Sequence, residues 1–326
     1  MKICLILEGC YPYVFGGVST WMHQYINNMK EHEFILWVIG ANAKDRGKFV
    51  YELPQNVTAV HEVFLDDALH VKASGKMRHR FSKEETDSLR ELMICGRPDW
   101  EVLFSLYQEK RLNPMSYLQS EEFLDILTKS CLTHYPYIAF ADAFHTMRSM
   151  LLPVLYLLGT EVPKADVYHA ICTGYGGMLA CLGGWMYQKK VLLTEHGIYT
   201  REREEEIIRA KWVVPSFKKQ WISFFYMLSD IIYRRAFQVT CLFTNAMLIQ
   251  IQMGCDAKKC RVIENGIHYE RLSQIPLKQE DGWVDIGAVV RLAPIKDIKT
   301  MIYAFFELSM RKKNVRLHIM GGVDDE

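Results

Sequence analysis

The sequence predicts an α/β protein built from two doubly wound, Rossmann-like domains, of which the first has a helical insertion and the second is incomplete. Short apolar runs alternate with amphipathic segments at the start of the chain, which is typical of strands buried in a parallel sheet. The alternation stops between about residues 66 and 163 and then resumes. Residues 281–326 contain one last strand–helix–strand unit. A complete domain of this type needs on the order of 100 residues, so the second domain is predicted to be incomplete.

The first elements follow the order expected of a doubly wound domain. Ile3–Leu7 is a short, continuous apolar run and predicts a buried strand. A loop over 8–17 follows it, and Val18–Met29 has the pattern of a helix. Phe34–Ile39 and Val57–Val63 predict two further strands, so the chain begins with the β-loop-α-β unit of that fold.

The segment from about 66 to 163 has helical periodicity and no convincing strand. We interpret it as a helical insertion in the first domain. Apolar residues recur at helical spacing in four stretches, Lys83–Ile94, Trp100–Lys110, Glu121–Ser130 and Phe140–Leu158.

The α/β alternation resumes after the insertion. We expect strands at Asp166–Ile171, Lys190–Thr194, Val239–Phe243 and Arg261–Glu264. We expect helices at Gly174–Tyr187, Arg201–Ala210, Lys211–Phe237 and Ala246–Met253.

A polar connection at Pro276–Gly282 separates the two predicted domains. We place the N-terminal domain at 1–280 and the start of the C-terminal domain at 281–326. The second domain is expected to contain strand Asp285–Val290, helix Asp297–Arg311 and strand Val315–Met320.

Composition narrows the kind of protein. The 326 residues include 39 Lys and Arg against 38 Asp and Glu, so the net charge of +1 creates no general attraction to nucleic acid. The 9 cysteines have no CxxC spacing, and we expect neither a metal site nor disulfides. The sequence has no export signal and no apolar stretch near the ~20 residues that span a bilayer. A cytoplasmic location, with peripheral contact at the inner face of the membrane left open, fits these features.

The loop after the first predicted strand is the first candidate site. It contains Gly16 and Gly17 at the carboxyl end of that strand, where ligands bind in open α/β sheets. Glycines there let backbone N–H groups approach a phosphate, and the following helix N-terminus adds positive partial charge. An ordinary strand-to-helix turn would have the same residues. The GxGxxG fingerprint is absent, which argues against a dehydrogenase.

A second candidate follows the predicted strand Lys190–Thr194. Glu195 and His196 end an otherwise apolar run, which favours a binding role at the cleft. Tyr199 and Arg201 follow in the same segment. The run 201–206 has mixed charges, and a solvated helix face is its simpler interpretation.

A third candidate opens the second domain. Arg291 follows a predicted strand, Lys296 precedes a predicted helix, and Asp297 is suited to be the N-cap of that helix. Two cations that bracket such a turn can hold a pyrophosphate without a metal.

In this order the three segments resemble family 4 retaining glycosyltransferases of the GT-B architecture. The matching strings are Gly16-Gly17-Val18, Asp166-Val-Tyr-His-Ala, Glu264-Asn265-Gly266 and the segment from Val290 to Asp297. The longer strings LEGCYPYVFGGVSTWMHQ and LTEHGIYTRERE are similar to one subgroup, the PelF glycosyltransferases of exopolysaccharide synthesis.

The resemblance implies a role for each matched position. Gly16 and Gly17 would lie against the diphosphate and sugar of a UDP-sugar donor, and His196 would be the catalytic histidine of the cleft. Glu195, Tyr199 and Arg201 would lie on the acceptor side. Residues 1–280 would form the acceptor-side domain, and 281–326 would begin the nucleotide-sugar-binding domain. Arg291 and Lys296 would neutralise the leaving diphosphate, so no metal or other cofactor is expected. The implied reaction transfers the sugar with retention to a growing Pel-like exopolysaccharide. The implied partners are the donor, the polysaccharide acceptor and inner-membrane synthase subunits, with no nucleic acid.

Four features of the sequence bear on alternative interpretations. The E-x7-E motif of this family is missing, as a truncated second domain would explain, and a non-catalytic partner docked on a membrane synthase complex is the competing hypothesis. An epimerase would need a nucleotide-cofactor fingerprint that is absent. His169 fits a buried core position at least as well as an acceptor contact. The aromatic stripe at Trp221, Phe224 and Phe225 fits core packing better than contact with a membrane surface.

Overall fold

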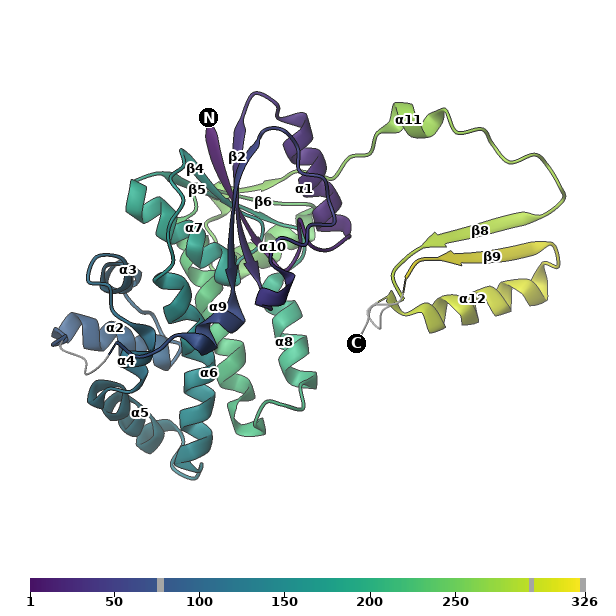
Figure 1. Ribbon diagram of the computed structural model, residues 1–326. Helices are drawn as coiled ribbons and strands as arrows, with labels where there is room; N and C mark the ends of the chain where they lie inside the picture. Colours follow the sequence, from purple (N-terminus) through teal and green to yellow (C-terminus); the bar gives the residue numbers. More distant parts are fainter. Residues whose placement is uncertain (75–78, 293–295, 323–326) are drawn as a thin grey trace. The chain divides into compact units, whose positions relative to one another are not determined.

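The computed structural model describes residues 1–74, 79–292 and 296–322, and its internal contacts divide the chain into two units (Figure 1). Unit 1 is Met1–Asn265 and unit 2 is Gly266–Glu326. The sequence predicts the domain boundary at residue 280, which lies C-terminal to the division after Asn265, in the exposed segment before the first strand of unit 2. Each unit is described by itself.

Unit 1 is built on one seven-stranded sheet in which all neighbouring strands are parallel, in the order β3-β2-β1-β4-β5-β6-β7. This topology confirms the predicted doubly wound α/β fold. The strands are β1 (Lys2–Glu8), β2 (Glu33–Gly40), β3 (Val57–Phe64), β4 (Val167–Ala170), β5 (Lys190–Glu195), β6 (Gln238–Cys241) and β7 (Cys260–Val262).

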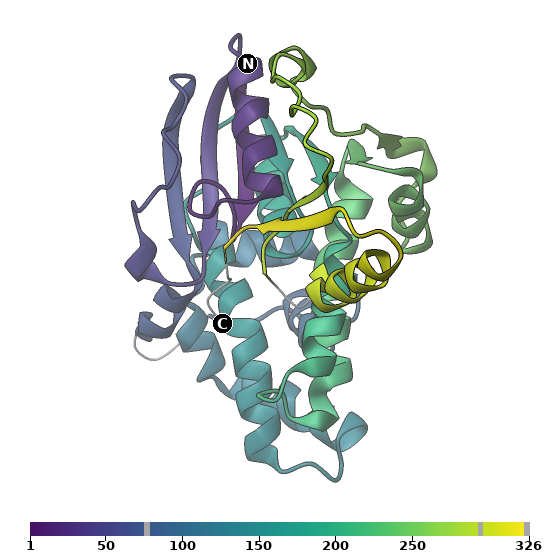
Figure 2. The ribbon, with the colours of Figure 1, turned by 90° about the vertical axis from the view of Figure 1, so that its right-hand side faces the viewer.

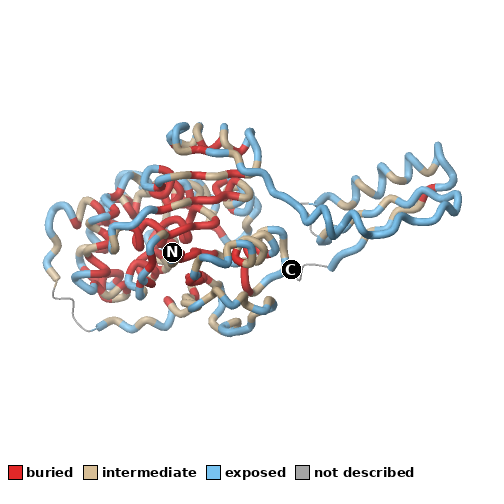
Figure 3. Tube along the Cα trace, turned by 90° about the horizontal axis from the view of Figure 1, so that it is seen from above, coloured by how far each residue is buried: buried red, intermediate tan, exposed pale blue. Residues whose placement is uncertain are grey.

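The continuous apolar runs of the central strands arise because both faces of the sheet are covered. Along β1, Ile3, Leu5 and Leu7 pack with helix α1 (Gly17–Asn28), whereas Cys4 and Ile6 face the opposite, larger core. Figure 3 shows that the buried residues gather in unit 1. Strands that are buried on both faces lose the polar alternation of a half-exposed sheet, which is why run length identified them in the sequence.

Helices that follow β4 share the larger core with the segment between β3 and β4. These helices are α7 (Gly174–Tyr187), α8 (Tyr199–Arg209), α9 (Lys218–Arg235) and α10 (Thr244–Gln252). The aromatic stripe of α9 is buried, with Trp221 8%, Phe224 0% and Phe225 8% exposed, so the core-packing interpretation is confirmed. The helix expected over Lys211–Phe237 is shorter, because Pro215 begins a separate 3-10 turn before it.

The segment between β3 and β4 is helical, and its described residues contain no strand. Its elements are the 3-10 turn Leu65–His70 and helices α2 (Lys83–Met93), α3 (Trp100–Gln108), α4 (Pro114–Leu118), α5 (Glu121–His134) and α6 (Phe140–Leu158). Helix α4 was not predicted, because five residues are too few to show a helical period. Asn113 caps it by accepting a hydrogen bond from the Ser116 N–H at 2.9 Å. The insertion shares the large core of the sheet.

Unit 2 contains helix α11 (Tyr269–Ser273) and one strand–helix–strand element. Strand β8 (Val284–Val289) pairs in parallel with β9 (Val315–Met320), and α12 (Ile298–Arg311) connects them. The Asp297 side chain caps α12 by accepting a hydrogen bond from the Thr300 N–H at 3.4 Å, as predicted.

The described helices include none that is both long enough and apolar enough to cross a membrane.

Candidate functional site

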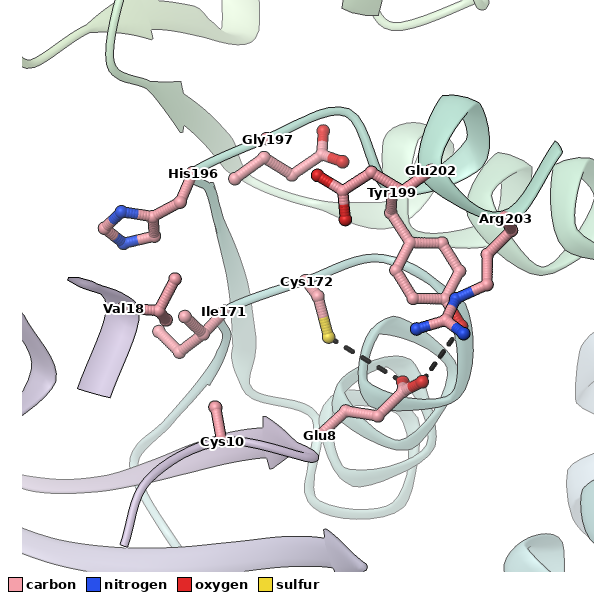
Figure 4. Close-up of a pocket in the computed structure, with 11 residues that line it drawn as sticks. Glu8, Cys10, Val18, Ile171, Cys172, His196, Gly197, Tyr199, Glu202 and Arg203 are labelled. Atoms are coloured by element: carbon pink, nitrogen blue, oxygen red, sulfur yellow. Dashed lines mark hydrogen bonds between the residues drawn. The ribbon is translucent and has the colours of Figure 1, made fainter. Parts of the chain in front are cut away.

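A cavity of about 180 Å³ lies where the winding of the sheet reverses (Figure 4). Chain order runs outward in both directions from the neighbouring pair β1 and β4, and open α/β sheets bind ligands beyond the carboxyl ends of such a pair. The cavity is lined by Glu8, Cys10, Val18, Ile171, Cys172, Glu195, His196, Gly197, Tyr199, Glu202 and Arg203. Three strand ends and the first turns of α1 and α8 therefore form one site.

Glu8 ends β1 and joins several parts of this cavity. Its Oε1 accepts a hydrogen bond from the Tyr199 hydroxyl at 2.9 Å, and its Oε2 accepts one from the Gly176 N–H at 3.2 Å. The Cys172 thiol also donates to Oε2, at 3.7 Å. Burial raises the pKa of Glu8, while Arg203 and these hydrogen bonds oppose the rise. Because Gly176 lies in the first turn of α7, this carboxylate occupies the N-terminus of α7.

Tyr199 and Arg203 come from adjacent turns of α8. The Arg203 guanidinium lies 5.1 Å from the centroid of the Tyr199 ring, and Nη1 is 2.7 Å from Glu206 Oε2. The buried Nε of Arg203 donates no hydrogen bond. A donor left unused beside a cavity can serve an anionic or polar ligand.

Tyr199 reaches Glu8 because Gly174 leaves room for its ring. Gly174 has φ +63°, and a Cβ on it would lie 2.3 Å from Cζ of Tyr199. Both the left-handed backbone and the close contact require glycine at this position.

His196 follows β5 and lies on the opposite side of the cavity from Arg203, directed toward Val18 (Figure 4). Its ring contacts Trp21 of α1 edge to face, with the centroids 4.5 Å apart. Burial lowers the pKa of His196, and its buried Nε2 has no hydrogen-bond partner. An uncharged imidazole with an unused nitrogen can exchange a hydrogen bond with a ligand hydroxyl.

Glu195 forms part of the wall, but its carboxylate is held from behind. Oε2 accepts hydrogen bonds from the Tyr233 hydroxyl at 2.7 Å and from Gln250 Nε2 at 2.8 Å. Burial raises the pKa of Glu195 from its ordinary 4.5 to about 7, and the two hydrogen bonds oppose part of that rise. Glu195 thus connects the site to α9 and α10 more directly than to a ligand.

Gly16 and Gly17 lie at the start of α1, whose Val18 lines the cavity. No side chain caps this helix and no acidic residue lies in its first turn. A Cβ on either glycine would meet nothing within 4 Å. The helix N-terminus therefore has room for an anion, and the binding of a phosphate there stays a prediction.

The other predicted site residues lie outside this wall. Arg201 is exposed on α8 and does not line the cavity. Arg291 and Lys296 are exposed in unit 2, on either side of residues 293–295, which lie outside the described part. His169 is buried and contacts Thr194 Oγ1 through Nε2 at 2.8 Å. Burial lowers the pKa of His169 to about 4. His169 is therefore a buried core residue, which is one of the two interpretations that the sequence allowed.

Sequence reasoning missed Glu8, Cys172 and Arg203. Glu8 ends an apolar strand just as Glu195 does, so the argument applied to Glu195 could have found it. Arg203 belongs to the charged run that was interpreted as a solvated face. Its position four residues after Tyr199 could have indicated that both side chains share one side of α8.

Unit 1 is a Rossmann-like domain with a cavity at the switch point of its sheet. A family model described as a domain of unknown function, DUF3492, matches residues 1–258. The chain belongs to this DUF3492 family. No curated protein matches the sequence.

Several solved structures resemble the chain at low sequence identity. Anabaena Alr3699/HepE in complex with UDP and glucose has a TM-score of 0.47 and 13% identity over 99% of this chain. Its complex with UDP-glucose has a TM-score of 0.46 and 12% identity over 99% of the chain and 61% of HepE. UDP-GlcNAc 2-epimerase from Methanocaldococcus jannaschii has a TM-score of 0.39 and 9% identity, over 100% of this chain and 74% of the epimerase. The chain spans 62% of the HepE chain in the first complex.

Proposed function

We propose that this chain is the acceptor-side part, with the beginning of the donor-side part, of a UDP-sugar-dependent retaining glycosyltransferase. One observation supports the proposal above the others. The uncapped N-terminus of α1, beside Gly16 and Gly17, opens at the same cavity as the uncharged His196 and the unused Nε of Arg203. A phosphate group and a neutral sugar hydroxyl would each find a suited partner there.

The cavity has mixed charges, because Glu8, Glu195 and Glu202 line it beside Arg203, so the donor's diphosphate would bind at its α1 end. The N-terminus of α1 supplies unpaired backbone donors and positive partial charge, and Arg203 adds a guanidinium. In the proposed enzyme Arg291 and Lys296 of unit 2 would complete the neutralisation of the diphosphate. This division of work would stabilise the charge that develops on the leaving group.

In the transfer step, the bond between the anomeric carbon and the diphosphate oxygen breaks, and a bond to an acceptor hydroxyl oxygen forms on the same face. The acceptor's proton goes to the departing phosphate oxygen. His196 would orient the reacting sugar through a hydrogen bond at Nε2. Its lowered pKa keeps the imidazole uncharged at neutral pH, so that it can accept as well as donate.

The acceptor in this proposal is a growing Pel-like exopolysaccharide, with inner-membrane synthase subunits as partners and the cytoplasm as location. The similarity of the strings around Gly16-Gly17 and Glu195-His196 to PelF glycosyltransferases supports this finer assignment.

Binding and turnover of a panel of UDP-sugars test the proposal. Calorimetry should detect one UDP-sugar that binds, and a UDP-release assay with oligosaccharide acceptors should detect transfer. Arg203→Ala should weaken binding about tenfold, as loss of one charge-assisted hydrogen bond predicts. Lys83→Ala, which removes an exposed cation of the helical insertion that does not line the cavity, should change nothing. Failure of every UDP-sugar to bind and to release UDP would refute the glycosyltransferase assignment.

A further inference from the structure

Two loops lie together at one end of unit 1, at the C-terminal end of α8, whereas the cavity lies at the N-terminal end of that helix. The first connects α5 to α6 and the second connects α8 to α9, and both lie at the lower end in Figures 1 and 2. The Tyr135 hydroxyl donates to Gln220 Oε1 at 2.9 Å, and its ring is 4.7 Å from that of Phe217. We call residues 132–140 and 208–219 the basic tip.

The basic tip exposes large apolar side chains to solvent. Tyr137 is 98% exposed and Trp212 is 69% exposed. Trp212 contacts Trp221 of α9 edge to face, with the ring centroids 5.4 Å apart, yet most of its surface stays exposed. The other exposed apolar residues of the tip are Leu132, Phe140 and Ile208.

The charges of the basic tip have one sign. Its Lys and Arg residues are Arg209, Lys211, Lys218 and Lys219, and it contains no Asp or Glu, whereas the whole chain has a net charge of only +1. Arg209 pairs with Glu205 of α8 at 3.5 Å, but both side chains are largely exposed and such pairs contribute little. Lys218 donates to the Ile208 carbonyl and retains its charge.

We propose that the basic tip docks unit 1 on an anionic lipid bilayer. Tryptophan and tyrosine favour the boundary between headgroups and acyl chains, because one part of each ring system is apolar and another can donate a hydrogen bond. Lysine and arginine beside them are attracted to anionic headgroups. A protein partner with an apolar surface would match the aromatic side chains but would not by itself explain four cations without an acid.

The basic tip has no part in the proposed reaction, because none of its residues lines the cavity. It is nevertheless connected to the cavity by one helix: α8 contributes Tyr199 and Arg203 to the wall and ends at the tip. An 11-residue helix is about 16 Å long. Docking would therefore hold the cavity close to the membrane surface whatever sugar the enzyme transfers.

Vesicle flotation of the complete chain tests the docking. One set of vesicles is neutral phosphatidylcholine, and the other contains about 30% anionic phosphatidylglycerol. The chain should float with the anionic vesicles and not with the neutral ones, and 0.5 M NaCl, about three times physiological ionic strength, should release it. Lys211→Ala with Lys219→Ala should lower the partition coefficient on the order of 30-fold. Trp212→Ser with Tyr137→Ser should lower it on the order of tenfold or more.

Matched controls keep this test specific. Lys48→Ala with Lys83→Ala removes two exposed cations elsewhere in unit 1, and Tyr269→Ser removes an aromatic residue that is 72% exposed in unit 2. These variants should float like the parent chain, and circular dichroism should show that all variants are folded. Equal flotation with neutral vesicles, or flotation that the tip variants do not weaken, would overturn the proposal. So would a tip that binds only a membrane protein and no vesicle.

Discussion

At the scale of single residues, the wall of the cavity contains buried carboxyl groups that are held by hydrogen bonds from neighbouring helices. Glu195 is 2% exposed and shares its Oε2 between Tyr233 and Gln250. Its raised pKa means that the folded protein binds this proton more tightly than the unfolded chain does. Between the ordinary value of 4.5 and about 7 the folded state holds more protons, so stability falls as pH rises through this window.

Glu195→Gln should therefore stabilise the protein at pH 8 by about 2 kcal/mol and change little at pH 4.5. Urea denaturation across that pH range measures the effect. The exposed Glu52→Gln is the control and should leave the pH profile of stability unchanged. A Glu195→Gln profile that is parallel to the parent's would show that the carboxyl is not the group that titrates.

Gly174 provides a second test at the same scale, because its backbone and its surroundings both exclude a side chain. Gly174→Ala should cost about 3 kcal/mol, since it adds left-handed strain to a clash with the Tyr199 ring. Gly47 has a similar φ of +70° but open space around it, so Gly47→Ala should cost only about 1 kcal/mol. Equal losses in the two denaturation midpoints would mean that the ring contact is unimportant.

At the scale of elements, the N-terminus of α1 lacks the residues that would stabilise the helix, and the proposed anion binding requires that they be absent. Its first turn has no acidic residue and no side-chain cap, although either would stabilise the helix. This omission is expected if a ligand anion takes that position.

Gly17→Asp should thus raise thermal stability, by about 0.5 kcal/mol or more, and weaken UDP-sugar binding at least tenfold. The side chain has room, because a Cβ at Gly17 meets nothing within 4 Å. Gly17→Asn separates charge from size and should weaken binding much less. If Gly17→Asp bound UDP-sugars as well as the parent chain, the N-terminus of α1 would not be the phosphate site.

The helical insertion shows what element-level reasoning can and cannot find. The stretch Phe140–Leu158 was predicted with the bounds that α6 has, because its apolar period is long and unbroken. Helix α4 was missed, since it depends on the Asn113 cap and on Pro114 at its first position rather than on a period. That the insertion packs on the sheet, and forms no separate core, could only be seen in the structure.

At the scale of the whole molecule, the two units differ in how much of their chain is buried. In the part of unit 2 that the structure describes, Val315 is the only buried apolar residue, and residues 263–283 are almost all exposed. The DUF3492 match ends inside unit 1, at residue 258. The difference in burial indicates that unit 1 holds most of the folding free energy.

Limited trypsin digestion of the complete chain should therefore cut first near Arg271, leaving a resistant fragment that contains unit 1. Mass spectrometry of the early fragments identifies the sites. Early cuts spread evenly through α2–α6 would contradict this picture, because they would show the insertion to be no more stable than the connecting segment.

Sequence alone determined the local pattern of this protein. Strand runs, helix periods, the Asp297 cap and the positions of Gly16, Gly17 and His196 at strand or helix ends follow from residue types and their spacing. Only the tertiary structure decided which strand ends meet. Glu8 contacts Tyr199 across 191 residues because β1 pairs with β4, and no local period encodes that pairing. Long-range strand order results from packing both faces of the sheet at once, and the composition of the cavity follows from that order.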